Sequence, residues 1–260
     1  MKNKRNIWRG FTQNVSYTGE NGLFSSPLEG VDVRRTDEGE SKTKNFWDNG
    51  YSASEYIGRI LKHTAIRNID DLFDYSDVNK YIEIVAAQNI TLVDNIIPDF
   101  VSVAEIRYIL SNLLRENVSI RDIVYIFEKI NDYAEESSRD DLLDKIRVSL
   151  ARHISKPFAN DEGIIQAIAI SDKTYDSMFD NSHDVDNIIR IDGTIAEKIV
   201  KKLMKSIKTL KIDIDNIIIL APLEIRHVVY VILSKFLPDI RVAANEEISN
   251  EYTLEIIDEI

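Results

Sequence analysis

Cysteine is absent from this 260-residue sequence, and so is any apolar run long enough to cross a lipid bilayer. Without cysteine the chain can form neither a disulfide framework nor a thiolate metal site. The longest apolar run, Ile217–Leu223, is far shorter than the about 18 residues of a membrane helix, and it suits a buried strand. The basic start, MKNKRNIWRG, is not followed by the apolar segment of a secretory signal. We therefore expect no direct membrane insertion by this chain.

Glycine and proline are scarce, at nine and five residues, which favours many helices and few long loops. The hydrophobic content of 44% is ordinary for a soluble globular chain, and the length allows one or two domains with a sizeable core. Positive charge is in deficit, with a net charge of −12. This total argues against a general phosphate-binding surface and a nucleic-acid partner, although it is compatible with a local basic patch.

The sequence also lacks the motifs of common enzyme classes. No GxSxG, HExxH, P-loop or GxGxxG pattern is present. Acidic pairs at residues 70–71 and 140–141 fall near expected helix starts, where carboxylates complement the helix dipole. The histidines do not have the spacing of metal ligands; they are His63, His153, His183 and His227. We predict no enzyme, no cofactor and no metal site.

What is present is most informative between residues 101 and 134, where the pattern predicts two helices with almost no loop between them. Ser102 and Glu105 have the spacing of a capping box for the first helix, and Asn117 with Val118 would form the turn. Ser119 and Asp122 repeat the capping pattern for the second. Apolar residues recur at helical spacing in both segments; they are Val103, Ile106, Leu110, Leu113 and Leu114, then Ile120, Ile123, Phe127 and Ile130.

The wider pattern predicts an α+β fold that is mostly helical. Residues 1–45 are polar and expected to be irregular or disordered, with a short strand at Gly30–Arg34. Residues 46–65 contain a linking helix, at about Ser54–His63, and residues 66–156 a central four-helix subdomain whose last helix runs from Arg139 to Ile154. Residues 157–260 alternate between strand and helix patterns, which predicts a small α/β subdomain with a partly parallel sheet.

Three segments resemble one known family. They are LSNLLRENVSIRDI (110–123) with the helix ending NDYA, DLLDKIRVSLARHI (141–154), and APLEIRHVVYVILSKFLPDIRVAANEEI (221–248). These segments are similar to the cytoplasmic domain of the type III secretion export gate family, which flagella and virulence injectisomes share. The resemblance covers roughly residues 50–260 in order, and Ser119–Asp122 is its most specific part. Members of the family carry a membrane-spanning half before this domain, and no such segment is present in this sequence.

The resemblance implies a docking and ring-forming module. Family members assemble into a nine-membered ring at the cytoplasmic face of the bacterial inner membrane, and their partners are export chaperones, secreted substrates and the ATPase stalk protein. We expect this chain to be a monomer in isolation, because the tether of the membrane half is missing. The residues it implies for a subunit or partner interface are Arg121, Asp122, Glu105, Arg115, Asn245 and Glu246.

Three alternatives stay open from the sequence. Asp122 could simply close the helix cap, with Arg121 solvated or paired with Glu105 or Glu116. The short turn could belong to a helix-turn-helix DNA-binding regulator, but residues 101–154 contain eight Lys and Arg against ten Asp and Glu. The chain could also be a degenerate fragment of the export gate that folds without assembling.

Overall fold

The computed structural model describes residues 7–8, 23–25, 32–36, 53–180, 182–185, 188–191, 193–211, 216–237 and 240–260. The chain forms two compact units, residues 1–68 and residues 69–260. None of the helices in the described ranges is both long and apolar enough to cross a membrane.

The first unit contains a small antiparallel sheet and one helix. Its strands are β1 (Ile7–Trp8), β2 (Leu23–Ser25) and β3 (Asp32–Thr36), in the order β1-β3-β2. β3 overlaps the strand expected at Gly30–Arg34, and β1 and β2 are two further short strands within residues 1–45. The other residues of 1–45 lie outside the described part of the chain. The linking helix is α1 (Ala53–Arg67), which extends beyond the expected His63.

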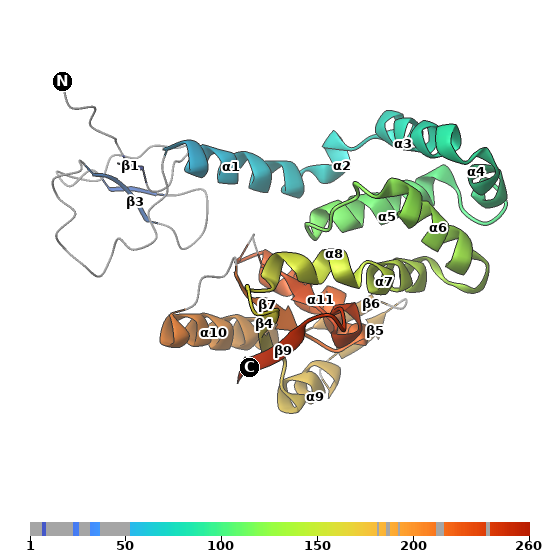
Figure 1. The fold of residues 1–260 in the computed structure, drawn as a ribbon. Coiled ribbons are helices and arrows are strands. Elements are labelled where there is room, and N and C mark those ends of the chain that lie inside the picture. The colour runs from blue at the N-terminus through green and yellow to red at the C-terminus, as the bar shows by residue number, and fades with distance from the viewer. Residues whose placement is uncertain are drawn as a thin grey trace, which may run out of the picture. The chain divides into compact units, whose positions relative to one another are not determined.

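The second unit begins with a helical part, residues 69–158 (Figure 1). Figure 1 shows α7 and α8 between α5–α6 and the strands of the α/β part, residues 164–260. The helices of the helical part are α2 (Ile69–Leu72), α3 (Tyr75–Gln88), α4 (Ile90–Ile96), α5 (Val103–Arg115), α6 (Ile123–Tyr133), α7 (Arg139–Ser149) and α8 (Ala151–Ser155). It also contains the short 3₁₀ turns η1 (Ala134–Glu136) and η2 (Lys156–Phe158).

Local capping sets where several of these helices begin. The predicted box at α5 is confirmed: the Ser102 amide donates to Glu105 Oε2 at 2.8 Å, and the Glu105 amide donates to Ser102 Oγ at 3.2 Å. At α3 the cap is Asp74, whose Oδ1 accepts from the Ser76 amide at 2.7 Å. At α4 the cap is Asn89, whose Oδ1 accepts from the Leu92 amide at 3.1 Å.

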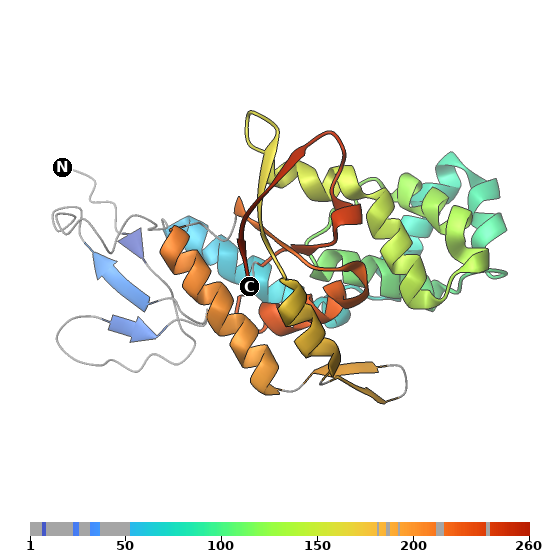
Figure 2. The ribbon, with the colours of Figure 1, turned by 90° about the horizontal axis from the view of Figure 1, so that it is seen from below.

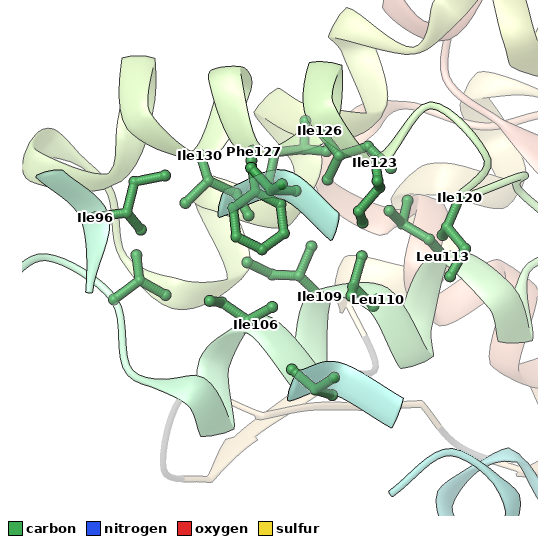
Figure 3. Packing of buried hydrophobic residues seen from close by; sticks show 14 of the residues in the cluster. Ile96, Ile106, Ile109, Leu110, Leu113, Ile120, Ile123, Ile126, Phe127 and Ile130 are labelled. Atoms are coloured by element: carbon green, nitrogen blue, oxygen red, sulfur yellow. The ribbon is translucent and has the colours of Figure 1, made fainter. Parts of the chain in front are cut away.

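The core of the helical part lies mainly between α5 and α6. Figure 3 shows Phe127 of α6 directed toward α5, close to Ile106 and Ile109, with Ile96 of α4 at one end. Ile106, Leu110, Leu113 and Phe127 are fully buried, so the predicted apolar faces are confirmed. The helix expected from Arg139 to Ile154 is interrupted at Leu150, where α7 ends and α8 begins.

The α/β part is built on a parallel sheet with the strand order β8-β7-β4-β9. Every pairing in it is parallel, which sharpens the prediction of a partly parallel sheet. The elements in chain order are β4 (Ile164–Ala169), α9 (Asp172–Asp180), the hairpin β5 (Ser182–Val185) and β6 (Ile188–Ile191), α10 (Gly193–Leu210), β7 (Ile218–Leu220), α11 (Leu223–Ser234), β8 (Val242–Ala243), the 3₁₀ turn η4 (Asn245–Glu247) and β9 (Thr253–Glu259).

Both faces of the sheet are covered, as a continuous apolar strand such as β7 requires. Ile168 and Ile219 pack on one side with buried residues of α10 and α11. On the other side Ile165 and Ile218 pack against Ile154 of α8, which also contacts the core of the helical part.

Truncating the core between α5 and α6 should destabilise the protein strongly. Leu113 and Phe127 are fully buried, so Leu113→Ala or Phe127→Ala should lower the free energy of unfolding by about 2–5 kcal/mol. Leu72→Ala is a matched control because Leu72 is 60% exposed. Denaturant unfolding followed by circular dichroism measures the three variants. Equal midpoints for the buried and exposed variants would show that these residues do not form the core.

Candidate functional site

The connector between α5 and α6 spans residues 116–122 and is longer than the two-residue turn that the sequence suggested. Asn117 has a φ of 59°, in the left-handed region that asparagine tolerates better than most residues. The Val118 amide donates to the Leu113 carbonyl at 2.8 Å, and the Asn117 amide donates to the Leu114 carbonyl at 3.0 Å. This pair of bonds is the Schellman motif, which ends α5 at Glu116.

The predicted second capping box, Ser119 with Asp122, is wrong. The helix begins at Ile123, and the side chain of Asp122 makes no capping hydrogen bond. Because the Schellman motif turns the chain away from α5, residues 118–122 continue as non-helical backbone. The long connector also differs from the three- or four-residue turn of a helix-turn-helix motif, so the geometry does not favour the DNA-binding alternative.

The connector presents polar residues outward on apolar anchors. Val118, Ile120 and Ile123 are buried at 6%, 6% and 5% exposure. Ser119, Arg121 and Asp122, which alternate with them, are exposed. Within the described part of the chain the Arg121 guanidinium makes no hydrogen bond or ion pair, so of the two local alternatives, solvation or pairing with Glu105 or Glu116, the pairing is not found. A charged, unpaired side chain held on an anchored segment is available for contact with another molecule.

Two other predicted interface residues have roles within α5. Glu105 caps the helix through Ser102, and these hydrogen bonds lower the pKa of its carboxyl. Arg115 forms an ion pair with Asp70 of α2 at 2.6 Å and a hydrogen bond with Asn112 at 3.0 Å. Both side chains are therefore engaged in holding the helical part together.

Asn245 and Glu246 are exposed on η4, beside the buried Glu247. The two residues predicted for the interface are therefore exposed, whereas the next residue along the chain is buried. Glu247 is fully buried, and its carboxylate accepts from the Ala244 amide at 3.1 Å. It belongs to an ion network whose pairings do not follow from the sequence pattern.

Two arginines and two glutamates form this network inside the second unit. Arg147 binds Glu247 through two hydrogen bonds, Nε to Oε1 at 2.5 Å and Nη2 to Oε2 at 2.9 Å. Arg147 Nη1 lies 2.9 Å from Glu116 Oε2, an ion-pair contact without hydrogen-bond angles. Arg226 Nη1 donates a hydrogen bond to Glu116, and Arg226 Nε lies 3.3 Å from Glu247 Oε1. We call these four residues the buried ion network.

Each member of the buried ion network comes from a different segment. Glu116 ends α5, Arg147 lies on α7, Arg226 on α11, and Glu247 on η4. All four are at most 5% exposed. Since α5 and α7 belong to the helical part and α11 and η4 to the α/β part, the buried ion network spans the junction between them.

The charges of the buried ion network balance when all four residues are ionised. Burial alone would raise the pKa of Glu116, but Arg147, a contact from His227 at 3.2 Å and Arg226 together lower it to about 2. Nearby, burial and the Glu116 charge raise the pKa of Tyr230 to about 12. At the edge of the buried ion network, burial raises the pKa of Asp144, although Arg226 lies 3.4 Å away.

Among the described residues no group of His, Asp and Glu is arranged to hold a metal ion.

The sequence contains one signal that could have indicated buried arginines. Arg147 lies four residues after Leu143, on the apolar face of its helix, and Arg226 follows Ile225 directly and lies three residues before Val229, both buried. A charged residue on an apolar face is rarely buried unless it has a partner. The partners themselves are not evident from the sequence.

Comparison with known proteins gives the family of the chain. Residues 23–253 match the FHIPEP family, so the chain belongs to this family and the sequence resemblance is confirmed. It is 25% identical over 228 residues to the flagellar biosynthesis protein FlhA of Bacillus subtilis, covering 86% of this chain and 33% of that protein. FlhA of Caulobacter vibrioides is 32% identical over 117 residues, or 45% of this chain and 16% of that protein. The chain thus spans about a third or less of these relatives.

Solved structures share its fold. The MxiA protein of Shigella flexneri matches with a TM-score of 0.75 and 20% identity over 92% of this chain and 74% of that chain. The nonameric SctV-C of EPEC matches with a TM-score of 0.73 and 19% identity over 98% of this chain and 78% of that chain. These matches confirm the predicted fold class.

Acid should weaken the fold through Glu116. Its carboxyl has an ordinary pKa of 4.5 and a folded pKa of about 2, so it stabilises the folded state above 4.5 and loses this effect as the pH falls toward 2. Glu116→Gln should flatten the decline of unfolding free energy between about pH 5 and pH 2. Glu135→Gln, at an exposed position, is the control and should keep the wild-type slope. Urea titrations across this range test the expectation, and parallel slopes for the two variants would contradict it.

Proposed function

We propose that this chain is a cytoplasmic docking and ring-forming module of a type III secretion export gate. Its membership of the FHIPEP family and its fold support this role over the DNA-binding and degenerate-fragment alternatives. Two nonameric assemblies, of EPEC SctV-C and of the EscV cytosolic domain, have the same fold, with TM-scores of 0.73 and 0.70. The module acts by binding, and its described residues supply no metal-binding cluster.

The exposed part of the connector carries the proposal of ring formation. Ser119, Arg121 and Asp122 project from a segment that Val118 and Ile120 anchor in the core. Arg121 offers a planar fork of donors that suits a carboxylate on a neighbouring subunit. Head-to-tail contacts of this kind close into a ring when the rotation between subunits permits it.

The proposed partners are export chaperones, secreted substrates and the ATPase stalk protein. A solved complex of the CdsV and CdsO proteins of Chlamydia pneumoniae contains a chain with this fold, at a TM-score of 0.69 and 16% identity. In the assembled apparatus the module would lie at the cytoplasmic face of the bacterial inner membrane. There it would receive substrates and pass them to the membrane-spanning part of the gate.

Charge reversal at Arg121 tests the ring contact. Arg121→Glu should reduce ring formation and secretion while the monomer stays folded, because the side chain has no partner within the described subunit. The change also places a negative charge just before α6, where the helix dipole favours it. Analytical ultracentrifugation over a range of concentrations measures assembly, and circular dichroism measures folding.

Arg152→Glu provides the matched control. The Arg152 side chain is 70% exposed on α8 and pairs with the exposed Glu251 at 3.2 Å, so its reversal makes the same change in charge away from the connector and breaks one exposed ion pair, which contributes little to stability. The proposal expects Arg152→Glu to assemble and support secretion like the wild type. Normal assembly of Arg121→Glu would remove this residue from the interface.

A further inference from the structure

A basic groove lies between α9 and α10, on the α/β part of a chain whose net charge is −12. The two helices lie next to each other and are joined through the β5–β6 hairpin (Figure 2). The groove is a recess of about 340 Å³. Its polar lining consists of Lys173, Lys198, Lys202, Thr174, Ser177 and Thr194.

The lysines of this groove have no acidic neighbour among its described lining residues. No described acidic residue lines the recess. Within the described residues Lys173 and Lys198 make no hydrogen bond or ion pair, and Lys202 donates to the neutral Thr174 hydroxyl at 3.0 Å. Three ammonium groups that surround one recess repel each other, and a bound anion would remove that repulsion.

The positive charge continues along α10 beyond the groove. Lys201, Lys205 and Lys208 are exposed, and Lys198 to Lys208 spans about 15 Å of helix axis. Glu197 is the single acidic residue of α10, and it pairs with Lys201 at 3.2 Å. The stripe therefore suits an extended ligand with several negative charges and not a single small anion.

The chemistry of the stripe distinguishes among extended anions. The helix contains no arginine, the residue that binds phosphate groups in a bidentate manner, and no aromatic side chain among the described residues lines the groove to stack on a base. A lipid surface would need an apolar face for insertion, but Ile195, Ile199 and Leu203 of α10 are buried in the core. Lysines and hydroxyls without a fixed fork suit carboxylates on a flexible chain.

We propose that the groove between α9 and α10, with the lysine stripe of α10, binds an acidic peptide segment of a partner protein. Carboxylates of the segment pair with Lys173, Lys198 and Lys202. Further carboxylates pair with Lys205 and Lys208. The inference rests on the docking role proposed above and supplies a partner chemistry for it, but it uses none of the connector residues.

Fluorescence anisotropy with the full chain tests the proposal. The probe is a labelled peptide, EESEESEESEE, and the comparison ligands are KKSKKSKKSKK and a single-stranded dT oligonucleotide of similar charge. The acidic peptide should bind at low salt, weaken at least tenfold between 50 and 300 mM salt, and bind more tightly than the oligonucleotide. Tighter binding of the oligonucleotide, or binding of the lysine peptide alone, would overturn the proposal.

Matched charge reversals locate the binding surface. The double variant Lys173→Glu and Lys198→Glu removes two unpaired lysines, so it should stay folded and weaken peptide binding at least tenfold. Lys156→Glu with Lys235→Glu changes the net charge equally at exposed positions outside the groove and should weaken binding less than threefold. Equal losses in both variants would mean that only net charge matters, and would overturn the site.

The ring and groove proposals can fail separately. The peptide assay uses the monomer and the groove variant, whereas the ring assay uses Arg121→Glu. Loss of peptide binding in Arg121→Glu would overturn the assignment to the groove. Normal ring formation by the groove variant, together with its loss of peptide binding, would support two independent surfaces.

Discussion

The second unit of this protein depends on one electrostatic constraint: Glu116, Arg147, Arg226 and Glu247 are buried together and must be paired together. Removing a charge from water costs several kcal/mol per ion, and only good geometry to opposite charges compensates for it. Here the bidentate Arg147–Glu247 contact and the shared contacts of Arg226 supply that geometry. Since each residue comes from a different segment, the compensation exists only when α5, α7, α11 and η4 are all in place.

This constraint links the buried junction to the surfaces proposed for docking. Glu116 is both a member of the buried ion network and the last residue before the connector turns outward at Asn117. Fixing Glu116 therefore fixes the start of the segment that presents Arg121. The lysine groove is built on separate elements, α9 and α10, so a bound partner there need not disturb the junction. The molecule thus combines a rigid interior with two exposed polar surfaces of different charge pattern.

Local interactions were predictable from the sequence, and long-range pairing was not. The Ser102–Glu105 box spans three residues, and the apolar repeats of α5, α6 and α10 follow the helical period, so both appear in the sequence. The Ser119–Asp122 box failed because α6 begins only at Ile123, which puts Asp122 itself at the N-cap position and leaves Ser119 three residues before it. The Arg147–Glu247 and Arg226–Glu116 pairs join residues 100 and 110 positions apart, and sequence periodicity carries no information about such contacts. The sequence also could not show which of two adjacent glutamates is buried: Glu246 is exposed and Glu247 is fully buried.

The most direct test of this account is a double-mutant cycle between Arg147 and Glu247, which connect the helical and α/β parts. Arg147→Met, Glu247→Gln and the double variant are unfolded in urea, and the free energies are compared with the wild type. Each single variant should leave the buried ion network with one uncompensated charge, so the double variant should be less destabilised than the sum of the two single variants by about 1–3 kcal/mol. Additive effects, within about 0.5 kcal/mol, would show that the two charges do not depend on each other and would contradict the account.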